Sequence, residues 1–198
     1  MLSSSPTNEG ARLGCVIMAS GMGKRFGGNK LMASFRGQPL IAHVLNATEG
    51  LFASRVVVTR HEDVAALCHA RGMRVILHDL PSRSDTVRLG LEAVGDADGC
   101  MFCPGDQPLL RRETVAALAA CARKDPEAIW RAAYKETPGS PVLFPKWAFT
   151  ELLTLPEGKG GSHVIKQHAG RVRFLDVEDP RELMDVDTPE DLEKLTAE

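Results

Sequence analysis

Short apolar runs rich in β-branched residues alternate along this chain with longer segments of helical periodicity. Such runs are typical of buried strands, and apolar residues spaced three and four apart are typical of amphipathic helices. The alternation predicts βαβ crossovers and an α/β fold, a Rossmann-like three-layer sandwich with a mostly parallel central sheet. The pattern predicts strands at residues 14–19, 54–59, 73–78, 99–104 and 128–134, and helices within 39–48, 62–72, 84–94 and 112–125.

The last third of the chain is less regular. Residues 136–147 hold three prolines and one glycine, so we expect a turn-rich connection there, followed by a helix within 147–155. A glycine cluster then precedes a short helix at 164–170, and a further strand is predicted at 171–177. The final helix begins after Thr188, a good N-cap residue.

Length and charge narrow the classes of function. The 198 residues suit one domain, which we assign to residues 12–198 after a short disordered leader at 1–11. Lys plus Arg number 24 and Asp plus Glu 26, so the net charge of -2 gives no overall attraction to nucleic acid or to an anionic membrane. No apolar run has the length of a membrane span, and the first residues lack the apolar core of a secretion signal. We therefore expect a soluble cytoplasmic protein with no nucleic-acid or membrane partner.

The five cysteines, an odd number, fit reduced thiols better than a disulfide framework. Cys100 and Cys103 have the CxxC spacing, but they fall in an apolar run that predicts a buried strand. No second cysteine pair or nearby histidine completes a zinc site. We expect these thiols to be packed in the core.

The loop after the first predicted strand combines glycines with cations. Residues 16–30, VIMASGMGKRFGGNK, hold four glycines and the basic residues Lys24, Arg25 and Lys30. Glycine lets backbone N–H groups line an anion site closely. A P-loop is excluded because Lys24 is followed by Arg25, and a dinucleotide fingerprint would need glycine where Phe26 stands. A triphosphate suits the three cations, with Arg25 and Lys30 as candidates to stabilise charge at its α-phosphate; a mobile basic turn is the alternative.

Acidic residues at two places could hold the metal that accompanies a triphosphate. Asp106 directly follows the predicted strand at 99–104 and falls at the same sheet edge as the glycine loop. Mg²⁺ prefers one or two carboxylates together with phosphates and waters. A second carboxylate could come from Asp185 or Asp187, although Asp187 or Thr188 could equally serve only as the cap of the final helix.

Six motifs in order resemble the MobA-like nucleotidyltransferases, and within them the molybdenum cofactor cytidylyltransferase branch. MASGMGKRFGGNKL is similar to the family signature LAAGxGxRxGxxK, and GQPLIAHVL, SDTVRLGL, PGDQPLL, GSPVLF and DVDTPEDL follow in the family's order. Any one of these motifs is unspecific, but their order makes the resemblance specific. It covers nearly the whole chain and implies a fold of the nucleotide-diphospho-sugar transferase type.

The resemblance implies a site residue by residue. Arg25 and Lys30 contact the triphosphate and are catalytic with Asp106, which binds Mg²⁺, and Asp187 matches the position that can complete the metal site. For Asp85 and Arg88 the alternative is a capped helix start, with Ser84 as the cap. The implied nucleotide-binding residues are Ala19, Ser20, Gly21, Gly23, Lys24, Asp85, Thr86 and Arg88.

Two positions depart from the family's pattern. Ser20 stands where the family has alanine, a small change that could alter a contact to the base. EGKGGSHVI stands where molybdopterin enzymes show a GDKGAR-like segment, in the region that would face the acceptor.

The implied activity is transfer of a nucleoside monophosphate, CMP from CTP, to a phosphorylated acceptor of the molybdopterin type, with release of pyrophosphate. A sister branch uses GTP, and a molybdoenzyme is a candidate recipient of the product. A phosphate monoester with a second pKa near ~6 is mostly dianionic at neutral pH, so the reaction requires no strong general base. The alternatives are a sugar-phosphate or isoprenoid-precursor nucleotidyltransferase, and a non-catalytic nucleotide-binding maturation factor.

Overall fold

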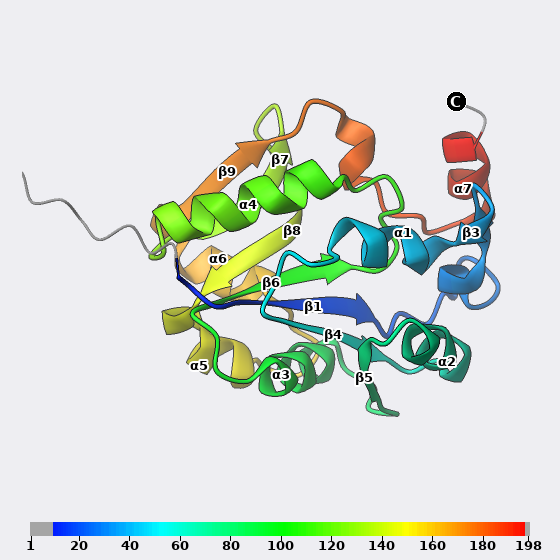
Figure 1. Cartoon of the computed structure of the whole chain (residues 1–198), viewed down its shortest axis with the longest axis horizontal. Helices are drawn as coiled ribbons and strands as arrows, with labels where there is room; N and C mark the ends of the chain where they lie inside the picture. The colour runs from blue at the N-terminus through cyan, green and yellow to red at the C-terminus, as the bar shows by residue number, and fades with distance from the viewer. Residues whose placement is uncertain (1–9, 197–198) are drawn as a thin grey trace, which may run out of the picture.

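A seven-stranded sheet lies between two layers of helices in the computed structural model, which describes residues 10–196 (Figure 1). The strands of this sheet are β1 (Leu13–Ala19), β4 (Ser54–Thr59), β5 (Arg74–Leu77), β6 (Gly99–Pro104), β7 (Ile129–Tyr134), β8 (Thr137–Pro145) and β9 (Val172–Asp176). The helices are α1 (Leu40–Ala47), α2 (Glu62–Ala70), α3 (Arg83–Val94), α4 (Arg112–Lys124), α5 (Phe149–Leu153), α6 (Ser162–Gln167) and α7 (Pro189–Thr196). A separate antiparallel pair is formed by β2 (Ser34–Phe35) and β3 (Gln38–Pro39).

The strand order is β5-β4-β1-β6-β8-β7-β9. Strand β1 runs parallel to β4 and to β6, and only β8 runs antiparallel to its neighbours. The chain moves from β1 outward to β4 and β5 and then returns to the other side of β1 at β6. This reversal places a topological switch point at the carboxyl ends of β1 and β6, the usual position of a ligand in such sheets. The mostly parallel sandwich predicted from the sequence is thus confirmed.

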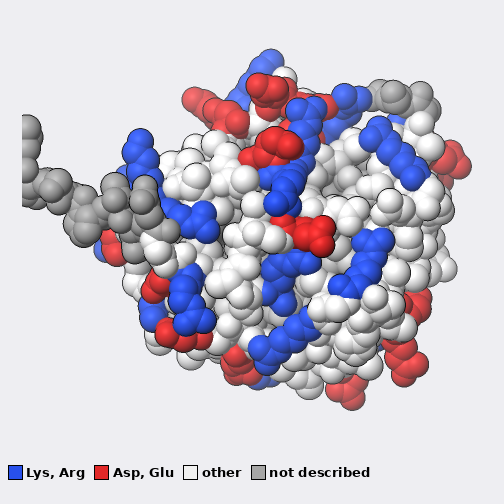
Figure 2. Space-filling view, viewed as in Figure 1, with Lys and Arg blue, Asp and Glu red and all other residues white. Residues whose placement is uncertain are grey.

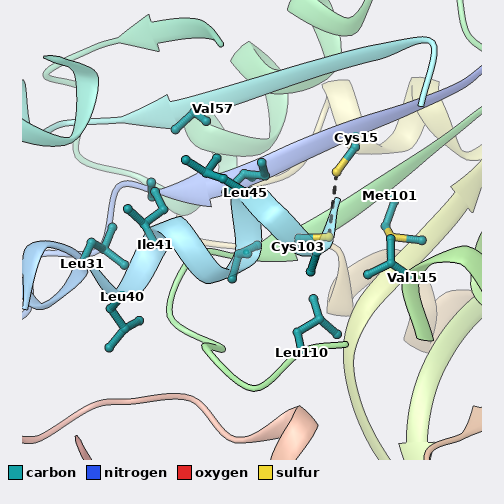
Figure 3. Packing of buried hydrophobic residues seen from close by; sticks show 14 of the residues in the cluster. Cys15, Leu31, Leu40, Ile41, Leu45, Val57, Met101, Cys103, Leu110 and Val115 are labelled. Atoms are coloured by element: carbon teal, nitrogen blue, oxygen red, sulfur yellow. Dashed lines mark hydrogen bonds between the residues drawn. The ribbon is translucent and has the colours of Figure 1, made fainter. Parts of the chain in front are cut away.

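Two apolar clusters fix the helices to the two faces of the sheet. Residues from α1, α2 and α4 pack on one face and residues from α3, α5 and α6 on the other. Figure 3 shows the first cluster, in which α1 contributes Leu40, Ile41 and Leu45. The sulfur atoms of Cys15 and Cys103 lie 3.9 Å apart within it. The predicted packing of the cysteines is confirmed, and burial raises the pKa of the neighbouring Cys100 thiol well above its usual range.

The segment at 136–147 departs from expectation, because most of it is strand β8 and not a turn-rich connection. Its prolines lower the strand propensity, but Val142, Leu143 and Phe144 are buried between the two helical layers. These residues pair with β6 on one side and with β7 on the other, where the register shifts between Arg131 and Ala133. Burial of the apolar half of the strand outweighs the local proline signal.

Residues 1–9 and 197–198 lie outside the described part of the chain, and most of the leader expected at 1–11 falls there. Within residues 10–196, no helix combines the length and the apolar character needed to cross a membrane. On the face drawn in Figure 2, basic and acidic side chains are interspersed, in keeping with the near balance of charge in the sequence.

Candidate functional site

Three segments far apart in the sequence meet at the carboxyl edge of the sheet. The glycine loop at 20–30 leaves β1, and residues 105–107 leave the adjacent β6. The N–H of Gly105 donates to the carbonyl of Met18 (2.9 Å), and the N–H of Val186 donates to the carbonyl of Asp106 (2.9 Å). The segment before α7 is thereby fixed beside the end of β6.

Four side chains from these segments form the carboxylate–lysine cluster: Lys30, Asp106, Asp185 and Asp187. The Lys30 ammonium lies 2.6 Å from Oδ2 of Asp106 and 2.9 Å from Oδ1 of Asp187. Arg25 adds a second cation, 2.8 Å from the other oxygen of Asp187. Burial alone would lower the pKa of Lys30, whose side chain is 9% exposed, but the charges and hydrogen bonds of Asp106 and Asp187 raise it. Lys30 is therefore a fixed positive charge at the base of the site.

The cluster holds three carboxylates, and the cations beside them are its own Lys30 and the adjoining Arg25. Desolvation by the surrounding protein, and then the negative charge of Asp106, raise the pKa of Asp185 to about 6. Within residues 10–196, no three His, Cys, Asp or Glu side chains stand close enough to hold a metal ion by themselves. Mg²⁺ takes its remaining ligands from phosphates and water, so the excess of carboxylate oxygen at Asp106 and Asp187 fits this ion together with a nucleotide.

The glycine loop is held open by contacts at its start and by one turn inside it. The Ser20 hydroxyl donates to the carbonyl of Val58 (3.1 Å) and accepts from Nε2 of His78 (2.8 Å), and Nε2 of His61 donates to the carbonyl of Gly21 (2.8 Å). Gly23 has a φ of +57°, and a Cβ there would collide with the carbonyl of Gly28. Sequence reasoning did not single out the two histidines, because nothing local marks them as loop contacts.

A cavity of about 420 Å³ opens above the cluster. Of the residues predicted for the nucleotide, Ser20, Gly21, Thr86 and Asp106 line it. Asp185, one of the two candidates for a second carboxylate, also lines it, as do four polar residues that were not predicted: Arg60, Ser82, Arg83 and Ser140. Asp106 comes from the loop after β6 and Thr86 from the first turn of α3, so the cavity is lined both by the cluster and by the start of α3.

Other predicted residues have different surroundings. The carboxylate of Asp85 accepts a hydrogen bond from the N–H of Ser82 (3.2 Å) in a capping box, so the cap of α3 is Ser82 and not Ser84. Arg88 lies 3.5 Å from Asp85 and 3.3 Å from Glu92 along the same helix. Neither Asp85 nor Arg88 lines the cavity, and Ala19 is buried while Lys24 is exposed. Their contacts to a nucleotide remain predictions.

A smaller cavity of about 140 Å³ adjoins the first. The two share the lining residues Met18, Arg83, Pro104 and Ser140, so their walls are continuous. The smaller one extends away from the cluster, between β8, α3 and the glycine-rich segment at 158–162.

Comparison with known sequences gives one family. The sequence profile of the MobA-like NTP transferase domain matches residues 15–172. A 3-deoxy-manno-octulosonate cytidylyltransferase from Alkalilimnicola ehrlichii is 35% identical over 120 residues, which cover 56% of this chain and 45% of that protein. A bifunctional IspD/IspF enzyme from Rhodospirillum rubrum is 31% identical over 147 residues, covering 64% of this chain and 36% of that enzyme. The matched region thus spans less than half the length of these relatives.

Solved structures share the fold. The crystal structure of Rv0371c from Mycobacterium tuberculosis H37Rv superposes with a TM-score of 0.83 at 25% identity, over 94% of this chain and 99% of that one. A CMP:2-keto-3-deoxy-manno-octonic acid synthetase complexed with CTP superposes with a TM-score of 0.77 at 20% identity, over 94% of this chain and 98% of that one. At this identity the second likeness concerns the fold alone.

Proposed function

Since the chain belongs to the MobA-like NTP transferase family, we propose that it transfers CMP from CTP to a small phosphorylated acceptor and releases pyrophosphate. The observation that carries this proposal is the carboxylate–lysine cluster at the base of the larger cavity. There the buried Lys30 ammonium lies 2.6 Å from Asp106 and 2.9 Å from Asp187, and Asp106 together with Asp185 lines the cavity. A cavity of about 420 Å³ is within the usual size range of a small-molecule site.

The choice of CTP as donor rests on the relatives named above. One is a cytidylyltransferase with 35% identity over its matched region. Thr86 and Ser82, at the start of α3, line the same cavity, and in this proposal their hydroxyls bind the ribose or the base. GTP, which a sister branch of the family uses, is the competing donor that the experiment below includes.

In the proposed reaction an acceptor phosphate oxygen attacks the α-phosphorus of CTP. The bond from that phosphorus to the bridging oxygen breaks, and pyrophosphate leaves with the electron pair of that bond. Lys30 neutralises the negative charge that develops at the α-phosphate, and its two carboxylate partners prevent it from swinging away. Backbone N–H groups of the glycine loop and Arg25 hold the other phosphates.

Asp106 and Asp187 are the residues that would hold Mg²⁺, whose charge stabilises the triphosphate and its leaving group. Asp187 has a lowered pKa, first because of its hydrogen bond from Lys30, so it is ionised at neutral pH. The acceptor phosphate is already mostly dianionic at that pH, and no side chain has to remove a proton. Positioning and charge account for the catalysis.

The acceptor is defined here by its chemistry. The molybdopterin-type acceptor expected from the sequence has no support among the relatives named above, which are a sugar-acid cytidylyltransferase and an IspD/IspF enzyme. The first name, that of an enzyme for a sugar acid, favours the sugar alternative that the sequence left open, and the isoprenoid-precursor alternative remains beside it.

Pyrophosphate release tests the proposal. The wild-type chain with Mg²⁺ is given CTP, GTP, ATP or UTP, each against sugar phosphates, isoprenoid-precursor alcohol phosphates and molybdopterin-type cofactor. We expect release with CTP and one acceptor class, and loss of release in Asp106→Asn but not in Asp176→Asn, an exposed aspartate on β9. Nucleotide binding without release from any pair would contradict the proposal and favour a non-catalytic maturation factor.

A further inference from the structure

The smaller cavity contains two arginines that face no acid. The side chain of Arg83, at the start of α3, makes no hydrogen bond or ion pair with any of residues 10–196. Arg131, on β7, donates from Nε (3.2 Å) and Nη2 (2.8 Å) to a single acceptor, the carbonyl of Gly139. Its Nη1 is left without a partner in the described part of the chain. We call this space the arginine cavity.

Among residues 10–196, Arg131 has no carboxylate partner of the kind that Lys30 has in Asp106 and Asp187. Arg131 is half-buried, and burial lowers the pKa of its guanidinium with no carboxylate nearby to offset the effect. Holding a guanidinium in such a place costs free energy unless an anion joins it. A guanidinium with a free N–H donor also matches the planar geometry of carboxylate and phosphate oxygens.

The glycine-rich segment at 158–162 closes one side of the arginine cavity. A Cβ on Gly161 would lie 2.7 Å from the ring of Phe144, and a Cβ on Gly160 would lie 2.9 Å from Cδ of Arg83. The segment is tied to α3 by a hydrogen bond from the N–H of Gly158 to the Ser82 hydroxyl (2.7 Å). Glycine is thus required for this close approach, which shapes the wall beside Arg83.

Apart from Ser140, Ser162 and the two glycines, the rest of the lining is apolar, and the space is small. A volume of about 140 Å³ leaves room for a small ligand only. A ligand that fills it therefore has a short apolar body and an anionic end. The apolar lining residues are Met18, Val87, Phe102, Pro104, Val142, Phe144, Leu152 and Ile165.

We propose that the arginine cavity is a subsite for the acceptor and that Arg131 selects acceptors carrying an oxyanion, phosphate or carboxylate, on a short apolar body. The inference rests on the proposed function, because Arg83 and Ser140 line both cavities and so connect this subsite to the nucleotide. Arg83 binds at the junction and Arg131 at the inner end. Arg131 is a specificity-determining residue here and takes no part in bond making.

Binding of two small anions tests the subsite. Butyl phosphate and pentanoate are titrated calorimetrically into the full chain, with butanol as the neutral comparison. We expect at least one anion to bind at millimolar concentration or tighter, and butanol to bind about tenfold more weakly or worse. The stronger of the two anions identifies the group that the subsite takes.

The variants assign the effect to Arg131. Arg131→Met is expected to weaken anion binding about tenfold, while Arg131→Lys, which keeps the charge, loses less. Arg173→Met is the matched control, since Arg173 is exposed on the neighbouring β9 and its side chain, among residues 10–196, donates to the carbonyls of Gly170 and Val172 alone. Melting temperatures show whether each variant folds, and Arg131→Lys keeps the test valid if Arg131→Met does not.

Three results would overturn the subsite: no binding of either anion to the wild type, butanol binding as tightly as the anions, or equal anion affinity in wild type and folded Arg131 variants. The pyrophosphate assay separates this failure from failure of the proposed function. Release with unaffected anion binding in the variants keeps the function and rejects the subsite. If anion binding depends on Arg131 but no pair of nucleotide and acceptor releases pyrophosphate, the anion site is kept and the proposed function is rejected.

Discussion

The two adjoining cavities differ in how their charges are balanced. In the carboxylate–lysine cluster each cation has an acidic partner, since Lys30 contacts Asp106 and Asp187, and Arg25 contacts Asp187. In the arginine cavity, Arg83 and Arg131 have no acidic partner among residues 10–196. The first arrangement retains spare carboxylate oxygen for a cation that arrives with a triphosphate, and the second retains spare donors for an anion. The two adjoining cavities can therefore bind two different ligands side by side, a metal-bound triphosphate in one and an anion in the other.

Removal of divalent metal should give the largest difference between the two cavities in their measured activities. With EDTA, pyrophosphate release should fall to background, because the triphosphate loses the ion that Asp106 and Asp187 are expected to hold. Binding of butyl phosphate to the arginine cavity should change less than twofold, since its cations belong to the chain. The two measurements are made on one sample before and after chelation, with Mg²⁺ added back as the control. A parallel loss of both would show that the cavities are not independent.

Lys30→Met should give the next largest effect. It removes the cation between two carboxylates, so turnover should fall about 10²–10³-fold. The free energy of unfolding should also fall, by up to about 3 kcal/mol, because the carboxylates lose their buried partner. Turnover and chemical denaturation measure the two losses. Lys124→Met, at an exposed lysine at the end of α4, is the control and should change neither by more than a small amount; equal effects in both variants would contradict a special role for Lys30.

Gly161→Ala should act on the arginine cavity alone. The added methyl group meets the ring of Phe144, and overpacking of this kind costs about 1–3 kcal/mol of stability. Anion binding should weaken, whereas affinity for CTP should not. Gly170→Ala is the matched control, because nothing lies within 4 Å of a Cβ there. If thermal melting and anion titration gave the same values for both variants, the tight approach of this segment would be refuted.

Asp85→Ala should have the smallest effect. Loss of its side chain from the capping box of α3 should cost about 1 kcal/mol of stability. Affinity for CTP should stay the same, because the Asp85 side chain does not line the larger cavity. Thr86→Val, at the neighbouring residue that does line it, should weaken CTP binding instead. The opposite outcome for the two variants would restore Asp85 as a nucleotide contact.

Much of the fold and one of the two cavities could be predicted from the sequence. Buried parallel strands are apolar runs, so β1, β4 and β6 are visible as patterns, and parallel strands bring their carboxyl ends to one edge. This logic placed Asp106 beside the glycine loop. The contact between Lys30 and Asp187 spans 157 positions and was not predicted, since no local pattern carries it.

The arginine cavity could not be predicted either, because it too depends on contacts between segments that are far apart in the sequence. Arg131 is a single cation in an otherwise apolar run, and its surroundings depend on β8, which pairs Val142 opposite it. The prolines of β8 hid that strand, and with it the neighbour that forms the cavity wall. Arg83 stood next to a predicted motif, but the absence of an acidic partner is a property of the packed chain and has no signature in the sequence.

The division of work between the two cavities is tested most directly by steady-state pyrophosphate release with CTP and the best acceptor, in Asp106→Asn and Arg131→Met side by side. We predict that Asp106→Asn lowers kcat with little change in the KM of the acceptor, and that Arg131→Met raises the KM of the acceptor about tenfold with a much smaller change in kcat. If both variants changed the same parameter by similar factors, the account of one cavity for chemistry and one for acceptor selection would be contradicted.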